Sequence, residues 1–248
     1  MPYYPQLNLL HLHCPKTGGT SLENTLQAAL GERLFDQAES KRRASNGDTR
    51  WQRENMYGHA EIDNEPFALQ HMTYTQMLEW GHLSTDDDDR PEKPIDMIVA
   101  VVRNPYSRIV SEYYWQRLFG LQTSFSEFVH YVHDKEVYKS RLHYQHLVPQ
   151  ANFVDQLVGD ERLHVVYFEH INEAMPLVFE EIVARCPDAV DKKKLCLRKD
   201  NVQRQKNARR PSWQEHYQTD TALAQLVYKM YRCDFELFGY ARNISADD

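Results

Sequence analysis

The segment LNLLHLHCPKTGGTSLENTLQAALG, residues 7–31, contains the pattern that decides the fold. Residues 7–13 are mostly apolar, which is typical of a buried strand. Residues 14–20 are of turn-forming types, and apolar residues then recur at helical spacing through residues 21–30 until Gly31, a natural helix stop. A strand, a glycine-containing turn and a helix in this order form the first half of a βαβ unit.

The turn has the composition of a phosphate- or sulfate-binding loop. Glycines let successive backbone N–H groups point inward, and the following helix N-terminus adds partial positive charge. The lysine precedes the glycines, so the loop is not a Walker A motif. The alternative is a plain Gly-Gly turn with an exposed lysine. The candidate ligands in the loop are Lys16, Thr17, Gly18, Gly19, Thr20 and Ser21.

A second motif follows the most apolar strand, which is expected over residues 95–102. Asn104 is expected to cap the next helix and Pro105 to open it. Arg103 therefore stands at the carboxyl end of a buried strand, where open α/β sheets bind ligands. Ser111 lies about two turns into the helix, and the pair suits a phosphate, although a salt bridge of Arg103 is the alternative.

The rest of the chain alternates helices and strands, which predicts an α/β fold with a mainly parallel sheet. We expect one domain over residues 1–248. The expected helices cover residues 73–80, 105–118, 125–133, 221–231 and a segment capped by Asn172, and a third strand covers 163–168. A polar insertion is expected at about 37–56, and an acidic, mobile loop at about 84–94.

Composition narrows the function classes. The chain has 248 residues and a net charge of −7, which argues against a nucleic-acid-binding surface. The first apolar run is too short for a membrane span, and no signal peptide is recognisable. Four cysteines without metal-ligand spacing suit reduced thiols and a cytoplasmic protein.

The two motifs together, PKTGGTS and VRNPYSRIVSEYY, resemble the 5′-phosphosulfate loop and the 3′-phosphate motif of sulfotransferases that use 3′-phosphoadenosine 5′-phosphosulfate (PAPS). This form resembles sulfotransferase family 2, the branch of heparan-sulfate 2-O-sulfotransferases and many bacterial relatives. The resemblance implies a P-loop-like three-layer sandwich, with Lys16 to Ser21 at the 5′-phosphosulfate and Arg103 and Ser111 at the 3′-phosphate. Further segments that resemble the branch are residues 69–73, 145–153, 207–208, 213–217 and 234–240.

Sulfuryl transfer by in-line displacement needs positive charge at the leaving group, expected from Lys16, and a base for the acceptor hydroxyl. Among 12 histidines, His71 matches the family segment best, and His59 is the second candidate. His11 and His13 are interpreted as packing or supporting groups. The reaction needs no metal.

Residues 192–210 contain nine Lys or Arg residues and one acid, Asp200. They form either a solvated charged face or a partner for the nucleotide or an anionic acceptor. Within this segment Arg204 and Lys206 are the candidates.

The expected function is sulfuryl transfer from PAPS to an acceptor hydroxyl, with a carbohydrate as the favoured acceptor. The alternatives are a catalytically silent nucleotide- or glycan-binding protein on the same fold, and a nucleotide or small-molecule kinase. The identity of the acceptor and the oligomeric state stay open at this point.

Overall fold

The computed structural model describes residues 2–31, 59–62, 65–80, 83, 95–140, 142–197, 211–218 and 220–244. By its internal contacts the chain divides into two compact units. Unit 1 is Met1–Val102 with Asn152–Asn201, and unit 2 is Arg103–Ala151 with Val202–Asp248. The expected insertion at 37–56 and the acidic loop at 84–94 lie outside the described residues, and the single domain stays a prediction.

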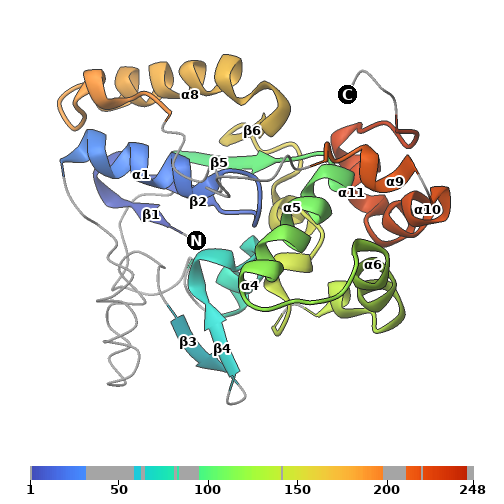
Figure 1. Cartoon of the computed structure of the whole chain (residues 1–248). Helices are drawn as coiled ribbons and strands as arrows, with labels where there is room; N and C mark the ends of the chain where they lie inside the picture. Colours follow the sequence, from blue (N-terminus) through green and yellow to red (C-terminus); the bar gives the residue numbers. More distant parts are fainter. Residues whose placement is uncertain are drawn as a thin grey trace. The chain divides into compact units, whose positions relative to one another are not determined.

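Unit 1 is built on a mixed, mostly parallel sheet in the order β1-β2-β5-β6 (Figure 1). β1 pairs antiparallel with β2, whereas β2, β5 and β6 are parallel. Leu12 lies opposite Ala100, and Val102 opposite Tyr167, so these parallel strands end at one edge of the sheet. The strands are β1 Tyr3–Tyr4, β2 Leu9–Leu12, β5 Met97–Val102 and β6 Leu163–Tyr167.

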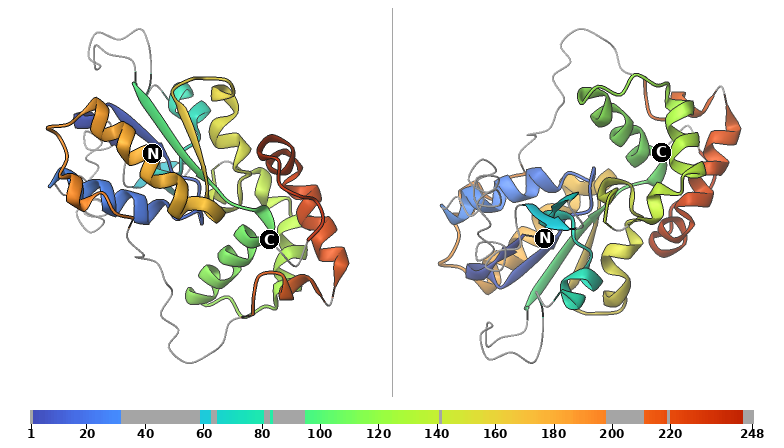
Figure 2. Two further views of the ribbon diagram at one scale, coloured as in Figure 1. Left: turned by 90° about the horizontal axis from the view of Figure 1, so that it is seen from above. Right: turned by 90° about the horizontal axis from the view of Figure 1, so that it is seen from below.

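Both faces of this sheet are covered, as the continuous apolar run of β5 predicts. All six residues of β5 are buried. Alternate strand residues share one core with α1 Gly19–Leu30 and α8 Ile171–Arg185, and Figure 2 shows these two helices side by side over the sheet. Helix α4, Tyr74–Glu79, lies on the opposite side (Figure 1). These features confirm the predicted α/β fold.

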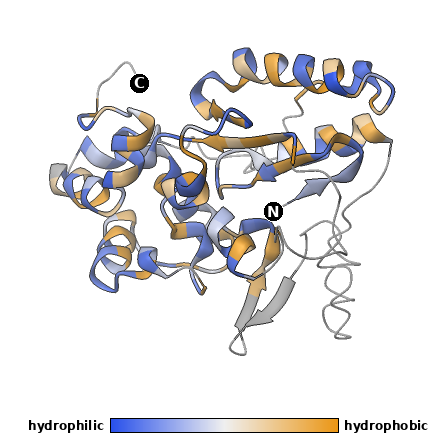
Figure 3. Cartoon of the chain, turned by 180° about the vertical axis from the view of Figure 1, so that it is seen from behind, coloured by the Kyte–Doolittle hydropathy of each residue, from blue (hydrophilic) through white to orange (hydrophobic). Residues whose placement is uncertain are grey.

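The helix ends in unit 1 follow local sequence signals, with one exception. Helix α1 ends at Gly31 in a left-handed conformation, and Thr73 and Gln76 form a reciprocal capping box at the start of α4. The prediction that Asn172 caps α8 is wrong: the helix begins at Ile171, after the 3₁₀ turn Phe168–His170. This turn runs directly into the helix and replaces a side-chain cap. Figure 3 shows the alternation of apolar and polar bands along α8.

A small antiparallel hairpin precedes the candidate base. Strand β3, His59–Ile62, pairs with β4, Glu65–Ala68, and His59 lies opposite Ala68. The 3₁₀ turn Leu69–His71 follows β4 at once. The backbone therefore places His59 close in register to the residues that lead into His71.

Unit 2 is helical and has an aromatic core. Asn104 accepts a hydrogen bond from the Tyr106 amide (3.0 Å) and Pro105 opens α5, which confirms the predicted cap. Buried tyrosines bond to main-chain carbonyls; Tyr217, for example, donates to the carbonyl of Tyr106 (3.0 Å). The helices are α5 Pro105–Leu118, α6 Phe125–Asp134, α9 Glu215–Gln218, α10 Thr221–Met230 and α11 Arg232–Phe238.

Short helical turns complete the described chain. Helix α7, Ala151–Val154, lies at the boundary between the units. The remaining 3₁₀ turns are Pro5–Leu7, Val137–Lys139, Gln145–Leu147, Asp155–Leu157 and Lys192–Lys194. Among the described helices, none combines the length and the apolar character that a bilayer span requires.

Candidate functional site

The loop between β2 and α1 has an unusual backbone conformation. Lys16 has φ 69° and Gly18 has φ 93°, so two left-handed residues flank Thr17. Such a conformation costs a lysine roughly 1–2 kcal/mol, and strained residues of this kind gather at functional sites. Thr17 is buried and donates its hydroxyl proton to the Cys14 carbonyl (2.8 Å), which closes the loop. The loop thus has the form of an anion-binding nest.

The loop leads directly into the N-terminus of α1. Gly18 caps the helix without a side-chain hydrogen bond, and its carbonyl accepts from the Ser21 amide (3.0 Å). The amides of Gly19 and Thr20 therefore lie at the positive end of a 12-residue helix. A side chain at Gly18 would place its Cβ 3.3 Å from the Phe168 ring, so the loop has little room for a larger residue.

His71, the favoured base, is buried in unit 1. Its Nδ1 lies 3.1 Å from the carbonyl oxygen of His13, and the rings of the two histidines meet edge to face at 4.7 Å. A carbonyl only accepts, so Nδ1 of His71 carries a proton and the basic nitrogen of the neutral ring is Nε2. The side chain of His59, the second candidate, lies outside the described part of the chain.

Beneath the loop lies a buried cluster of His11, His13 and Glu23, whose possible ligand atoms all fall within 4.8 Å of one another. His13 Nδ1 is 2.5 Å from Oε1 of Glu23, and His11 Nδ1 is 3.5 Å from the same oxygen. Burial disfavours ionisation of Glu23, but the attraction of His13, its hydrogen bond and the nearby His11 outweigh it and lower the pKa to about 2. Burial lowers the pKa of His11, which therefore stays neutral at pH 7.

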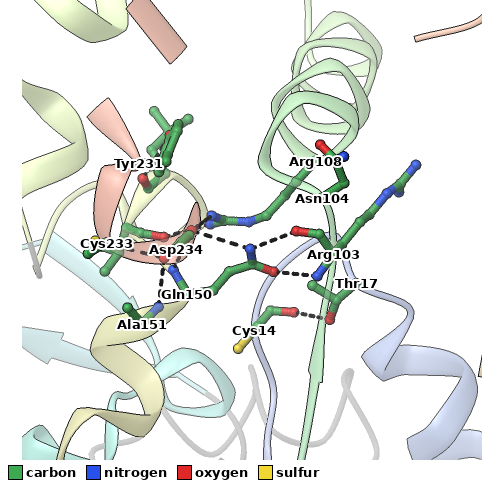
Figure 4. A network of polar contacts seen from close by, with 12 residues as sticks. Cys14, Thr17, Arg103, Asn104, Arg108, Gln150, Ala151, Tyr231, Cys233 and Asp234 are labelled. Carbon is green, nitrogen blue, oxygen red and sulfur yellow. Dashed lines mark hydrogen bonds and ion pairs between the residues drawn. The ribbon is translucent and has the colours of Figure 1, made fainter. Parts of the chain in front are cut away.

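In unit 2, the main chain of Arg103 is fixed by a buried glutamine. The side-chain oxygen of Gln150 accepts from the Arg103 amide (2.8 Å), and its Nε2 donates to the Arg103 carbonyl (2.8 Å). Gln150 therefore makes a pair of hydrogen bonds like those between neighbouring strands. Figure 4 shows Gln150 lying between Arg103 and Asp234.

Asp234 is the centre of this network. Its carboxylate accepts from the amides of Gln150 (3.0 Å) and Ala151 (2.8 Å), and Arg108 lies 3.7 Å away. Burial raises the pKa of Asp234, against the opposing effects of Arg108 and the two amides. Arg108 also donates to the carbonyls of His146 (2.9 Å) and Val148 (2.6 Å). Arg108 therefore has a buried acid as its partner.

The side chain of Arg103 extends along the start of α5. Its Nε donates to the hydroxyl of Ser107 (2.8 Å). Ser111, half-buried, follows Ser107 by four residues and so lies on the same helix face. The structure therefore aligns Arg103, Ser107 and Ser111, and the sequence had indicated only the first and the last.

Besides Ser107, three further contributors were not predicted individually: Glu23, Gln150 and Asp234. Glu23 and Asp234 are charged residues among the mostly apolar buried residues of a helix, which is the signal that could have found these two. Gln150 lies in a turn and has no such signal. Glu23 stands between Leu22 and Leu26 on the face of α1 that packs on the sheet, and it is buried although it is an acid. The candidates Arg204 and Lys206 lie outside the described residues.

The left-handed lysine before α1 and the arginine that directly follows β5 are features that proteins of the α/β class use for phosphate or sulfate esters. The sequence profile of the sulfotransferase family matches residues 3–241. The chain therefore belongs to the sulfotransferase family, a group of transferases that move sulfuryl groups. A comparison with curated proteins gives no match.

Proposed function

We propose that this enzyme transfers a sulfuryl group from PAPS to an acceptor hydroxyl, with a carbohydrate as the acceptor class. The observation that carries the donor assignment is the left-handed Lys16 beside the amino end of α1. A charged donor, backbone amides and a helix N-terminus together suit the 5′-phosphosulfate. Arg103 and Ser111, on one face at the start of α5, suit the 3′-phosphate.

The role of the loop in this reaction is to stabilise the negative charge that forms on the leaving group. The acceptor oxygen forms a bond to sulfur while the bond from sulfur to the bridging oxygen of the donor breaks, and 3′-phosphoadenosine 5′-phosphate leaves. Negative charge grows on that bridging oxygen. Lys16 and the amides of Gly19 and Thr20 would stabilise it, as donors in an oxyanion hole do.

His71 is the proposed base. Because Nδ1 is held by the His13 carbonyl, Nε2 of His71 is the nitrogen that would take the proton of the acceptor hydroxyl. His59, which is paired in register with Ala68, remains the second candidate for this role. The carbohydrate acceptor rests on the resemblance of the two motifs to the heparan-sulfate branch.

The decisive experiment combines calorimetry and transfer. We expect the wild-type protein to bind 3′-phosphoadenosine 5′-phosphate at one site and to move labelled sulfuryl groups from PAPS to a member of a glycan panel. Lys16→Ala should lower the single-turnover rate by about a hundredfold or more, because it removes charge stabilisation at the leaving oxygen. Its melting temperature should stay within a few degrees of wild type.

The outcomes separate the alternatives. Nucleotide binding without transfer to any tested acceptor class, or to water, would favour a catalytically silent binding protein. Undiminished turnover in Lys16→Ala would remove the role proposed for the loop. Transfer to phenols or amines but to no sugar would contradict the carbohydrate acceptor alone.

A further inference from the structure

Three of the contacts that His13 makes lead to parts of the proposed site. Its side chain is hydrogen-bonded to Glu23 on α1, its ring lies against Gly19, and its carbonyl binds His71. Both His13 and Glu23 are buried. A residue with these contacts connects the loop, the first turn of α1 and the candidate base.

The first contact fixes the tautomer of His13. Glu23 is ionised above a pKa of about 2, so its carboxylate can only accept a hydrogen bond. The proton between the two groups therefore belongs to Nδ1 of His13. At 2.5 Å this is a short, charge-assisted hydrogen bond in a buried place, where its strength is greatest.

The second contact explains why residue 19 is a glycine. A Cβ at Gly19 would lie 2.5 Å from Nε2 of His13 and would overlap the ring. The ring therefore occupies the space beneath the first residue of α1. Because Glu23 stands one turn further along the same helix, the pair links the two ends of this first turn.

The third contact reaches the base. The carbonyl of His13 accepts from Nδ1 of His71, and the edge-to-face packing of the rings limits rotation of His71. A shift of His13 would move both the amino end of α1 and the imidazole of His71.

A metal ion is a weaker explanation for the same cluster. His11, His13 and Glu23 would supply three ligands, and all three are buried. The short hydrogen bond between His13 and Glu23 leaves no space for an ion between their atoms. Bonds from zinc to nitrogen and oxygen are each about 2 Å, so an ion bridging both atoms would need them further apart.

We propose that Glu23 and His13 form a positioning pair that sets the geometry of the phosphosulfate loop and the orientation of His71. This inference rests on the proposed function and adds two residues to its site. The pair does not touch the reacting atoms; it acts through the backbone of α1 and the His13 carbonyl.

The test compares Glu23→Gln with a matched control in the same helix. Thr25 is also buried and hydrogen-bonded, to the carbonyl of Ser21 (2.8 Å) and to that of Cys196 (3.3 Å), so Thr25→Val measures general loss of packing. Binding sites are counted by calorimetric titration with 3′-phosphoadenosine 5′-phosphate, and affinity for inorganic sulfate is measured separately. Single-turnover rates are then expressed per binding site.

We expect Glu23→Gln to lower the single-turnover rate per site by about tenfold to a hundredfold, as small misplacements of catalytic groups do. Sulfate affinity should fall several-fold, and the KM for acceptor should stay within twofold. Thr25→Val should lower the melting temperature but keep the rate per site. Glu23→Asp, which keeps the charge on a shorter side chain, should recover part of the rate.

The proposal would be overturned if Glu23→Gln had the same rate per site and the same sulfate affinity as the wild type. Stoichiometric zinc in the purified protein would also overturn it.

If Glu23→Gln does not fold, nitrogen NMR of the wild-type histidines decides. A protected, far-downfield proton on Nδ1 of His13 that shifts on addition of sulfate supports the pair, and its absence overturns it. If the wild-type protein binds sulfate but transfers no sulfuryl group, the proposed function fails while sulfate affinity still tests the pair.

Discussion

At the scale of single residues, the site depends on a few side chains in unusual states. Lys16 adopts a left-handed backbone, and Glu23 is a buried carboxylate on α1, one turn after its first residue. A buried carboxylate without a hydrogen-bond partner would be costly. His13 supplies that partner by donating its Nδ1 proton to Glu23.

The role of His71 leads to a residue-scale prediction. His71→Ala should lower the single-turnover rate by about a hundredfold to ten-thousandfold, the usual contribution of a general base, while nucleotide affinity stays within twofold. His59→Ala, measured under the same conditions, is the matched control. A large loss in His59→Ala with a near-normal rate in His71→Ala would transfer the role to His59.

Residue identities could be predicted from sequence where the signal is local. Gly18 stands in a short turn whose glycines permit a left-handed backbone, and the structure has it there, whereas the left-handed Lys16 was not predicted. The partners of Arg103 could not be predicted in this way. Gln150, which binds its main chain, lies 47 residues away, and Asp234, which binds Gln150, lies a further 84 residues along the chain. A local sequence pattern cannot predict contacts between residues this far apart.

At the scale of elements, most strands and helices could be predicted from the spacing of apolar residues and from capping residues. Strand β5 and helix α5 were predicted because an apolar run, an N-cap and a proline succeed one another. The two-residue β1 and the β3–β4 hairpin were not predicted, since strands this short have no detectable alternation. The start of α8 was misplaced by two residues, because a 3₁₀ turn took the place of the expected cap at Asn172.

The junction of β5 and α5 is held by elements that come much later in the chain. Asp234→Asn should lower the free energy of unfolding by roughly 3–5 kcal/mol, because it leaves the buried Arg108 without its counter-charge. Urea unfolding measures this loss. Affinity for 3′-phosphoadenosine 5′-phosphate should fall as well, since Gln150 would lose the acceptor that holds it against Arg103.

The same substitution elsewhere in unit 2 provides the control. Asp220 caps α10 by accepting from the Ala222 amide (3.0 Å), and asparagine is an equally good cap. Asp220→Asn should therefore leave both stability and nucleotide affinity nearly unchanged. A loss below about 1 kcal/mol in Asp234→Asn would show that the network contributes little, as many ion pairs do.

At the scale of the whole molecule, the proposed function uses side chains from both units. Lys16 belongs to unit 1, and Arg103 is the first residue of unit 2, joined by one peptide bond to the last residue of β5. The proposed function assigns Lys16 to the 5′ end of the nucleotide and Arg103 to the 3′-phosphate, so the two substitutions should affect different ends of it.

This division can be measured with two nucleotides. Arg103→Ala should weaken binding of 3′-phosphoadenosine 5′-phosphate by about tenfold to a hundredfold, the range for charged hydrogen bonds, and leave binding of adenosine 5′-monophosphate almost unchanged. Lys16→Ala should weaken both nucleotides, because both carry the 5′-phosphate. Calorimetry on the two variants and the wild type gives the change in affinity of each variant for each nucleotide. Equal losses for both nucleotides in Arg103→Ala would mean that this arginine stabilises the junction after β5 and does not select the 3′-phosphate, so that selection would have to come from other residues.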